Sequence, residues 1–292
     1  MADVNALISD SESLPMLPTA TSQLIGMLGD DDVSINDVAE IVRVDEALSF
    51  AVLRYANSAA FGVPSRKFDL RESIVRLGRS ALTKIVLEQQ AATVFSGGCD
   101  AFELSRERLW RGAIGGALAA ESLAAEHNPE LKDLAFVTGL VRDVGKLVLD
   151  RAYGVDYVTS VQSKLYADRT FVDAEREAFG TDHAQVGAAL CRHWQLPERI
   201  ARAVEYHHCP PEDGELHDEL TDFVHAGDIV ALWSGISLGS DGLQYELADH
   251  VKKSLKLSRR AAERAIASMW DSLRSIEEAL GIETEDKERN IA

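Results

Sequence analysis

Three groups of residues in this sequence have the types and spacing that chemistry or ligand binding requires. The first lies in segment 138–146, where Asp143 stands in an apolar stretch between Arg142 and Lys146. A buried carboxylate is costly unless a cation or a metal ion neutralises it. The pattern therefore fits a metal-binding aspartate. It fits equally well an internal ion pair of Asp143 with Arg142, with Lys146 or with a more distant cation.

The second group is a set of histidines that fall close together in the chain, namely His183, His193, His207 and His208. Neutral imidazoles, together with carboxylates such as Asp143 and Asp228, suit a borderline divalent metal ion. Neighbours in a helix point in different directions, so we expect only one of His207 and His208 to serve a given site. The alternative is that these histidines end helices, where the C-terminal dipole favours them.

The third group is the segment ANSAAFG at 56–62, with Asn57 and Ser58 near the end of a predicted helix. Such side chains commonly bond to the backbone and set a turn, so a helix end closed by Gly62 is the favoured interpretation. Other catalytic patterns are missing from the sequence: it has no HExxH, GxSxG, P-loop or GxGxxG after a strand. Its three cysteines include no CxxC pair, which excludes a zinc ribbon.

Composition excludes several classes of protein. With 30 Lys+Arg and 48 Asp+Glu in 292 residues, the formal net charge is −18, which argues against non-specific nucleic-acid binding. Hydrophobic residues make up 46%, which is typical of a globular chain. The first twenty residues lack the apolar run of a signal peptide, and no apolar run reaches the ~18 residues of a membrane span. We therefore expect a cytoplasmic protein without membrane contact.

The spacing of apolar residues predicts an all-α protein, because the period-2 alternation of half-buried strands is nearly absent. Five short helices are expected before residue 96, and the segment LKDLAFVTGLVRDVGKLVLD is expected to form one buried helix, bent near Gly139. The predicted units are a flexible N-terminus (1–13), an N-terminal helical subdomain (14–96), a second helical subdomain (97–235), C-terminal helices (242–282) and a tail (283–292).

Several segments, in order, resemble the HDOD domain family. They include LPMLPTATSQLIGML, VDEALSFAVLRYANSAAFGVP, TGLVRDVGKLVL, EREAFGTDHAQVGAALCRHWQLPERIARAVEYHH and DFVHAGDIVA, which together span roughly residues 14 to 235. The resemblance implies an N-terminal helical subdomain packed on an HD-domain-like helical bundle, with a C-terminal helical extension. It also implies a bacterial signalling protein related to the HD superfamily of metal-dependent phosphohydrolases, and most closely to its cyclic-di-GMP-hydrolysing branch. Asn57, Ser58 and Glu175 match signature positions of the family.

The resemblance also shows where this chain departs from the catalytic relatives. Gly112 stands where the first metal-binding histidine is expected, and Arg142 replaces the histidine of the His-Asp pair. The positions that still match are Asp143, Lys146, His183, His207 or His208, and Asp228. An arginine cannot bind a metal ion. The resemblance therefore implies a degenerate site with an Arg142–Asp143 ion pair and no cofactor. Any residual metal would be held by Asp143, His183, His207, His208 and Asp228.

Three functions follow from this comparison. The leading one is a non-catalytic signalling module, a pseudoenzyme that acts through a protein partner, which the acidic surface predicts to be basic. The second is a metal-dependent phosphohydrolase or phosphodiesterase with an altered metal shell. The third is a sensor that binds a nucleotide or cyclic dinucleotide without turnover, with Arg142 and Lys146 holding a phosphate. The C-terminal helices are expected to pack on the domain or to build a homodimer.

Overall fold

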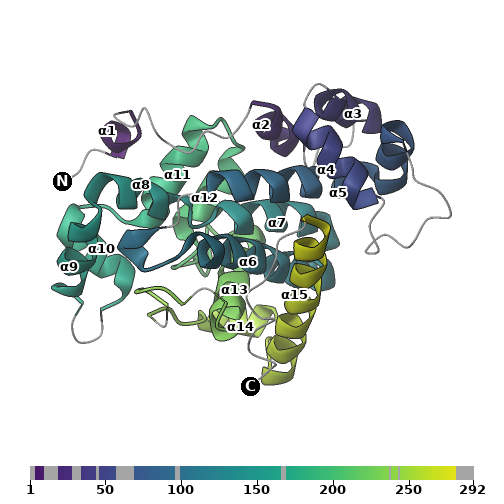
Figure 1. Cartoon of the computed structure of the whole chain (residues 1–292). Coiled ribbons are helices and arrows are strands. Elements are labelled where there is room, and N and C mark those ends of the chain that lie inside the picture. Colours follow the sequence, from purple (N-terminus) through teal and green to yellow (C-terminus); the bar gives the residue numbers. More distant parts are fainter. Residues whose placement is uncertain are drawn as a thin grey trace, which may run out of the picture.

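The chain folds into helices, seen here in a computed structural model (Figure 1). The structure describes residues 4–9, 19–27, 34–43, 46–56, 69–95, 99–165, 169–236, 238–242 and 244–280. Within these ranges the regular elements are α-helices and short 3-10 turns, with no β-strand. The predicted all-α class is confirmed. None of the helices in these ranges combines the length and the hydropathy needed to cross a membrane.

The first helices form a subdomain with an apolar core of its own. Its elements are α2 (Thr19–Gly26), α3 (Ile35–Arg43), α4 (Glu46–Ala56) and α5 (Leu70–Val94). The buried side chains of this core include Leu24, Val38, Val42, Leu48, Val52, Ile74 and Leu82. α5 spans two predicted helices that meet at Gly78, where φ is 74° and ψ is 173° and the backbone is not helical. Only glycine adopts this conformation readily, so the helical path breaks and changes direction there.

The N-terminus differs from the predicted flexible segment 1–13. Residues Val4–Ser9 form the short helix α1, which packs against α8 and α11 at the far side of the molecule from α2–α5 (Figure 1). Ile8 is buried there in the main core. The apolar side chains of this short helix are enough to hold it against the main body.

The main body is built around α6 (Arg106–His127), which packs against α7 (Lys132–Val141) and α13 (Glu219–Trp233). Small residues let these helices approach closely. A Cβ at Gly139 would lie 2.9 Å from the Cα of Ala117, and one at Gly227 would lie 2.7 Å from the amide nitrogen of Ala120. The backbones are therefore nearly in contact, which fixes α7 and α13 relative to α6.

The segment predicted as one buried helix is two helices. After α7 the chain breaks at Arg142 and Asp143, and α8 (Val144–Tyr153) begins. The prediction of a bend near Gly139 was wrong, because Asp143 has a φ of −100° and a ψ of 9° and so ends the helical path. The break lets the two charged side chains leave the helix surface and enter the space between helices.

The remaining helices surround this body. They are α9 (Val155–Gln162), α10 (Phe171–Phe179), α11 (His183–His193), α12 (Glu198–Tyr206), α14 (Asp249–Ser254) and α15 (Arg259–Leu280). The long helix α15 packs along α6 and also reaches α4, so the C-terminal extension folds back on the domain (Figure 1). The helix predicted from residue 242 is shorter than expected, because the described residues before Asp249 are not helical.

Glycine at the crossing of α8 and α11 positions the histidine that begins α11. A Cβ at Gly145 would lie 2.0 Å from the carbonyl oxygen of His183 and 2.6 Å from the amide nitrogen of Gly187. We expect Gly145→Ala to lower the free energy of unfolding by about 3 kcal/mol or more, because both close contacts are to backbone. Gly26→Ala is the control, since nothing lies within 4 Å of that Cβ. Urea denaturation of the two variants measures the difference, and equal stabilities would contradict the close crossing.

Candidate functional site

The break between α7 and α8 places Asp143 at the centre of a buried cluster. Asp143 is the N-terminal capping residue of α8, yet its side chain makes no capping hydrogen bond. The carboxylate turns instead towards His183 and His207, with Oδ1 at 3.7 Å and 3.9 Å from their Nε2 atoms. Only 8% of Asp143 is exposed, and both histidines are fully buried.

A carboxylate behind His183 fixes the direction of its ring. Asp182 caps α11 by accepting from the amide of Gln185 at 2.8 Å, which makes His183 the first helical residue. Glu175 on α10 accepts from the backbone amide of His183 at 3.2 Å and from its Nδ1 at 2.7 Å. Tyr157 donates to the other oxygen of Glu175. The Nε2 atom of His183 therefore faces Asp143, in the arrangement of a carboxylate that orients a metal-binding histidine.

The end of α12 contributes two histidines to the same cluster. His207 donates from Nδ1 to the carbonyl of Val204 at 2.7 Å, and His208 lies with its Nε2 at 2.8 Å from the Nε2 of His183. The expectation that only one of the pair serves the site was wrong. The chain turns after Tyr206, so the two imidazole rings lie 3.8 Å apart, centre to centre, instead of on opposite faces of a helix.

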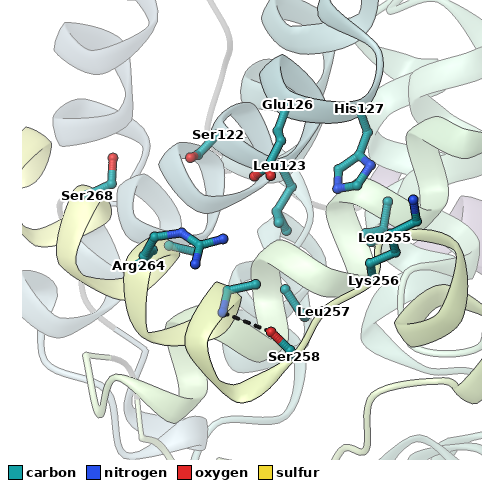
Figure 2. A pocket seen from close by; sticks show the side chains of 12 residues that line it. Ser122, Leu123, Glu126, His127, Leu255, Lys256, Leu257, Ser258, Arg264 and Ser268 are labelled. Atoms are coloured by element: carbon teal, nitrogen blue, oxygen red, sulfur yellow. Dashed lines mark hydrogen bonds between the residues drawn. The ribbon is translucent and has the colours of Figure 1, made fainter.

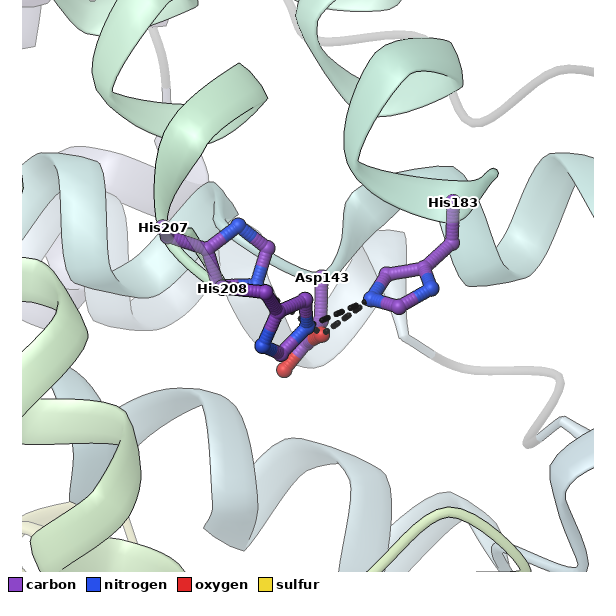
Figure 3. Close-up of side chains that lie close together, drawn as sticks. All are labelled: Asp143, His183, His207 and His208. Atoms are coloured by element: carbon purple, nitrogen blue, oxygen red, sulfur yellow. Dashed lines mark hydrogen bonds and ion pairs between the residues drawn. The ribbon is translucent and has the colours of Figure 1, made fainter. Parts of the chain in front are cut away.

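Four side chains thus bring metal-binding atoms together: Asp143, His183, His207 and His208 (Figure 3). One ligand atom from each lies within 4.8 Å of all the others. Burial lowers the pKa of His207 to about 4 and keeps that of His208 well below its usual value, so both rings are neutral. Because Nδ1 of His207 donates to a carbonyl, its Nε2 lone pair faces the carboxylate of Asp143.

Buried acceptor atoms that face one another need a cation or a proton between them. Oδ1 of Asp143, Nε2 of His207 and Nδ1 of His208 are all buried without a hydrogen-bond partner. The donor set of one carboxylate and three imidazoles fits a divalent ion of the zinc type. Lys146 supplies a positive charge here as well, with Nζ at 3.0 Å from Oδ1 of Asp143, although this contact lacks hydrogen-bond geometry.

Arg142 takes the space beside this cluster. Its side chain is 2% exposed, and Nε donates to Oδ1 of Asp228 on α13 at 2.7 Å. Nη1 donates to the carbonyl of Gly139 at 2.7 Å, and Nη2 donates to that of Gly112 at 3.2 Å. The predicted pair with Asp143 is present but longer, at 3.3 Å. Asp228 is therefore the main partner of Arg142, and its other oxygen, Oδ2, lies 3.9 Å from Nδ1 of His208 at the edge of the cluster.

The departures at residues 112 and 142 are linked in space. The carbonyl of Gly112 accepts from the guanidinium that replaces the expected histidine of the His-Asp pair. One turn along α6, a Cβ at Gly116 would lie only 2.3 Å from Nη1 of Arg142. Glycine on this face of α6 makes room for the arginine side chain. A histidine at residue 112 and an arginine at residue 142 would compete for the same region.

Residues after α13 cover the site, and the sequence patterns did not point to them. Asp241 is buried and accepts from Lys146 Nζ at 2.7 Å, while Tyr245 stacks on the ring of His208 with 3.8 Å between centres. His225 joins this cover to the site, because Nδ1 donates to the carbonyl of His207 and Nε2 accepts from the amide of Ala248. Asp241 lies in a run of turn-forming residues, which gave no signal of a buried ion pair.

The charges of the buried groups are not balanced. Four carboxylates (Asp143, Glu175, Asp228 and Asp241) surround two cations (Arg142 and Lys146). Burial alone would lower the pKa of His183, but the Glu175 carboxylate outweighs it and raises that pKa. In Asp143, burial opposes ionisation, yet Lys146 and Arg142 hold the pKa of the carboxyl well below its usual range. Asp143 is therefore ionised at neutral pH, and acidic side chains that outnumber the two cations favour a further cation or proton.

Of the residues that the sequence singled out, Asn57 and Ser58 lie outside the described residues. His193 is exposed at the end of α11, away from the cluster. Glu175 is placed directly behind His183. The sequence patterns missed Tyr157, although its hydroxyl completes the chain of hydrogen bonds to His183.

The Arg142–Asp228 pair gives a test by mutation. Arg142→Met leaves the buried carboxylate of Asp228 without its cation, so we expect the free energy of unfolding to fall by about 3–5 kcal/mol. In the double variant, Asp228→Asn combined with Arg142→Met removes that charge and should recover about 1–2 kcal/mol of the free energy of unfolding. The control is Arg192→Met, because that arginine is 42% exposed and its ion pairs contribute at most about 1 kcal/mol. Strictly additive losses in urea denaturation would contradict the coupling.

The neutral histidines predict a loss of stability in acid. The unfolded chain binds protons at His207 and His208 below pH ~6.5, whereas the folded chain binds one at His207 only near pH 4. Between these values stability must fall as the pH falls, and the raised pKa of His183 opposes only part of this loss. We expect about 2 kcal/mol less stability at pH 5 than at pH 7. His207→Gln should flatten the profile, and the exposed His193→Gln should not.

Comparison with known proteins shows the family to which the chain is similar. The HDOD domain family matches residues 14–210. An uncharacterized protein of Treponema pallidum is 27% identical over 216 residues, which is 73% of this chain, and this chain spans only 41% of that relative's length.

Solved structures resemble the whole fold. An HDOD domain protein of unknown function from Geobacter sulfurreducens is 25% identical with a TM-score of 0.70, and the match covers 96% of each chain. A candidate phosphohydrolase from Shewanella amazonensis shares the fold at 21% identity, with a TM-score of 0.61 and coverage of 90% and 98%. A candidate signal-transduction protein from Marinobacter aquaeolei does so at 21% identity, with a TM-score of 0.68 and coverage of 94% and 60%. With a family match across two thirds of its length and a helical fold shared with a solved HDOD domain protein, this chain belongs to the HDOD family.

Proposed function

We propose that this chain is a non-catalytic HDOD signalling module that acts through a protein partner. The observation that carries the proposal is the placement of Arg142, whose guanidinium bonds to Asp228 and to the backbone of α6 and α7 where a metal-binding histidine is expected. A guanidinium stays protonated at any working pH and cannot bind a metal ion. The guanidinium also bonds to the carboxylate of Asp228, so this side chain is lost to the site as a second metal ligand.

The four side chains that remain form a closed set. Asp143, His183, His207 and His208 would fill the four positions that a tetrahedral ion such as Zn²⁺ offers. Structural metal sites are closed in this way, whereas catalytic sites leave one position for water. In a hydrolase the bound metal supplies a hydroxide and polarises the phosphate. With four protein ligands around it, such an ion would have no position left for that hydroxide.

The burial of the cluster supports the same function. Asp143 is 8% exposed, His183 and His207 are fully buried, and Tyr245 stacks over His208. A surface pocket of about 250 Å³ between α10, α11 and α12 reaches His208 from its outer side. A phosphodiester could enter that pocket without contact with Asp143. The site therefore serves to hold helices together.

A phosphohydrolase is the second candidate, and the assembled Asp143–histidine cluster is the observation that favours it. The third candidate, a cyclic-dinucleotide or nucleotide sensor, has less support. Arg142 and Lys146 would have to hold the phosphate, but both are bonded to buried carboxylates. A phosphate ligand would have to break one of these ion pairs before it could contact the freed cation.

A protein partner is supported by the charge and the surface of the chain. The net charge of −18 favours a basic partner, since complementary charges speed association. The N-terminal subdomain exposes two large apolar side chains, Phe50 on α4 at 65% and Val75 on α5 at 69%. Exposed apolar side chains of this size are common at protein interfaces.

An activity assay separates the first two functions. We expect no turnover of bis-(p-nitrophenyl) phosphate or of cyclic dinucleotides after the purified chain is incubated with Mg²⁺, Mn²⁺, Zn²⁺ or Fe²⁺, because no coordination position is open. Metal-dependent hydrolysis that disappears in Asp143→Ala and persists in the surface variant Asp271→Asn would overturn the proposal. Circular dichroism of each variant shows that it is folded.

A further inference from the structure

A second site lies away from the histidine cluster, at the other end of α6. A pocket of about 550 Å³ opens between the last turns of α6 and the junction of α14 and α15 (Figure 2). Pockets of this volume hold small molecules. The wall formed by α14 and α15 comes from residues after 210, beyond the part of the chain that matches the family.

The floor of this pocket is apolar and belongs to the core. Leu123, Leu255, Leu257 and Ala265 line it, and each is at least nine-tenths buried. They are part of the apolar cluster that joins α6, α13, α14 and α15. Three hydroxyl groups, from Ser122, Ser258 and Ser268, line its walls. Seven of the twelve lining residues are polar or charged, so a polar rim surrounds the apolar floor, which suits a small amphipathic molecule.

Two cations without ion-pair partners stand at this pocket. Lys256 and Arg264 line it, and neither makes an ion pair with any acid of the part of the chain that the structure describes. On α15, Arg259 pairs with Glu263 and Arg274 with Asp271, whereas Arg260 has no ion pair within the described residues. Lys256 and Arg264 differ from such surface cations because both line one pocket with an apolar floor. They favour an anion as the occupant.

The backbone of Lys256 supplies an independent observation. Its φ is 47°, in the left-handed region, where the residue follows the end of α14. The amide of Leu257 donates back to the carbonyl of Lys252 at 3.0 Å, which is the bond that closes a helix end of this kind. Glycine is usual at this position because a Cβ is strained there. The strain of Lys256 is not offset by an ion pair of its side chain, which instead lines the pocket.

We propose that this pocket binds a small organic anion, with its carboxylate or phosphate monoester group at Lys256 and Arg264 and its apolar body on the leucine floor. The N-terminal end of the 22-residue helix α15 adds positive potential, since Leu257, Ser258 and Ala261 line the same wall. Ser258 caps this helix by accepting from the amide of Ala261 at 3.3 Å (Figure 2).

Glu126 limits which anions fit. Its carboxylate lines the pocket from the last turn of α6, beside His127. It repels a second negative group and can accept a hydrogen bond from a hydroxyl on the ligand. The occupant would touch α6 and α15 at once, and α15 also contacts α4. Binding here would therefore stabilise the C-terminal extension on the domain without contact with the histidine cluster.

The test uses the full chain and three probes that share one apolar body, the 3-phenylpropyl group: 3-phenylpropyl phosphate, 4-phenylbutyrate and the neutral 3-phenylpropanol. We expect saturable binding of at least one of the two anions, measured by calorimetry or by NMR titration up to about 10 mM. Whichever anion binds more tightly identifies the acidic group. Arg264→Gln and Lys256→Gly should each weaken binding about tenfold, whereas Glu126→Gln should tighten it.

Lys256→Gly separates a loss of binding from a loss of folding. Glycine relieves the left-handed strain, so the midpoint of thermal unfolding should stay within about 2 °C of the wild type or rise. Arg274→Gln is the matched control on the same helix, because its partner is Asp271 and it lies outside the pocket. The proposal is overturned if neither anion saturates, if the alcohol binds as tightly as the anions, or if Arg274→Gln weakens binding as much as Arg264→Gln.

Discussion

The buried guanidinium of Arg142 is the constraint on which the centre of this protein depends. A charged group with 2% exposure is stable only if every donor finds an acceptor, and here Asp228 and the carbonyls of Gly139 and Gly112 provide them. These acceptors belong to α13, α7 and α6. One side chain therefore fixes three helices, and the glycine at residue 116 is required because any larger side chain would overlap with the guanidinium.

The same interaction decides what the rest of the cluster can do. Asp228 is held by Arg142, so Asp143 is left to face three imidazoles and Lys146. Burial keeps two of these imidazoles neutral, which preserves their ability to bind a cation. The remaining donors, Asp143 and the three histidines, lie within 4.8 Å of one another. In the proposed function, loss of catalytic geometry and retention of a tightly bonded core are two results of the arginine at residue 142.

The pattern of apolar residues predicted most of the fold, because helical spacing depends on local sequence. It predicted an all-α protein, and the helices of the described residues confirm that class. It failed where long-range contacts decide the outcome. The break at Arg142 and Asp143 occurs inside an apolar stretch that contains no proline. We attribute it to the burial of these two charged side chains.

The sequence by itself determined the class, the family resemblance and the identity of the charged residues that meet in the core. It could not determine that both His207 and His208 face Asp143, that Asp228 is the main partner of Arg142, or that Asp241 and Tyr245 cover the site. These are contacts between residues far apart in the chain. They depend on how α6, α7, α12 and α13 pack, and side-chain spacing along one helix carries no information about the distance to another.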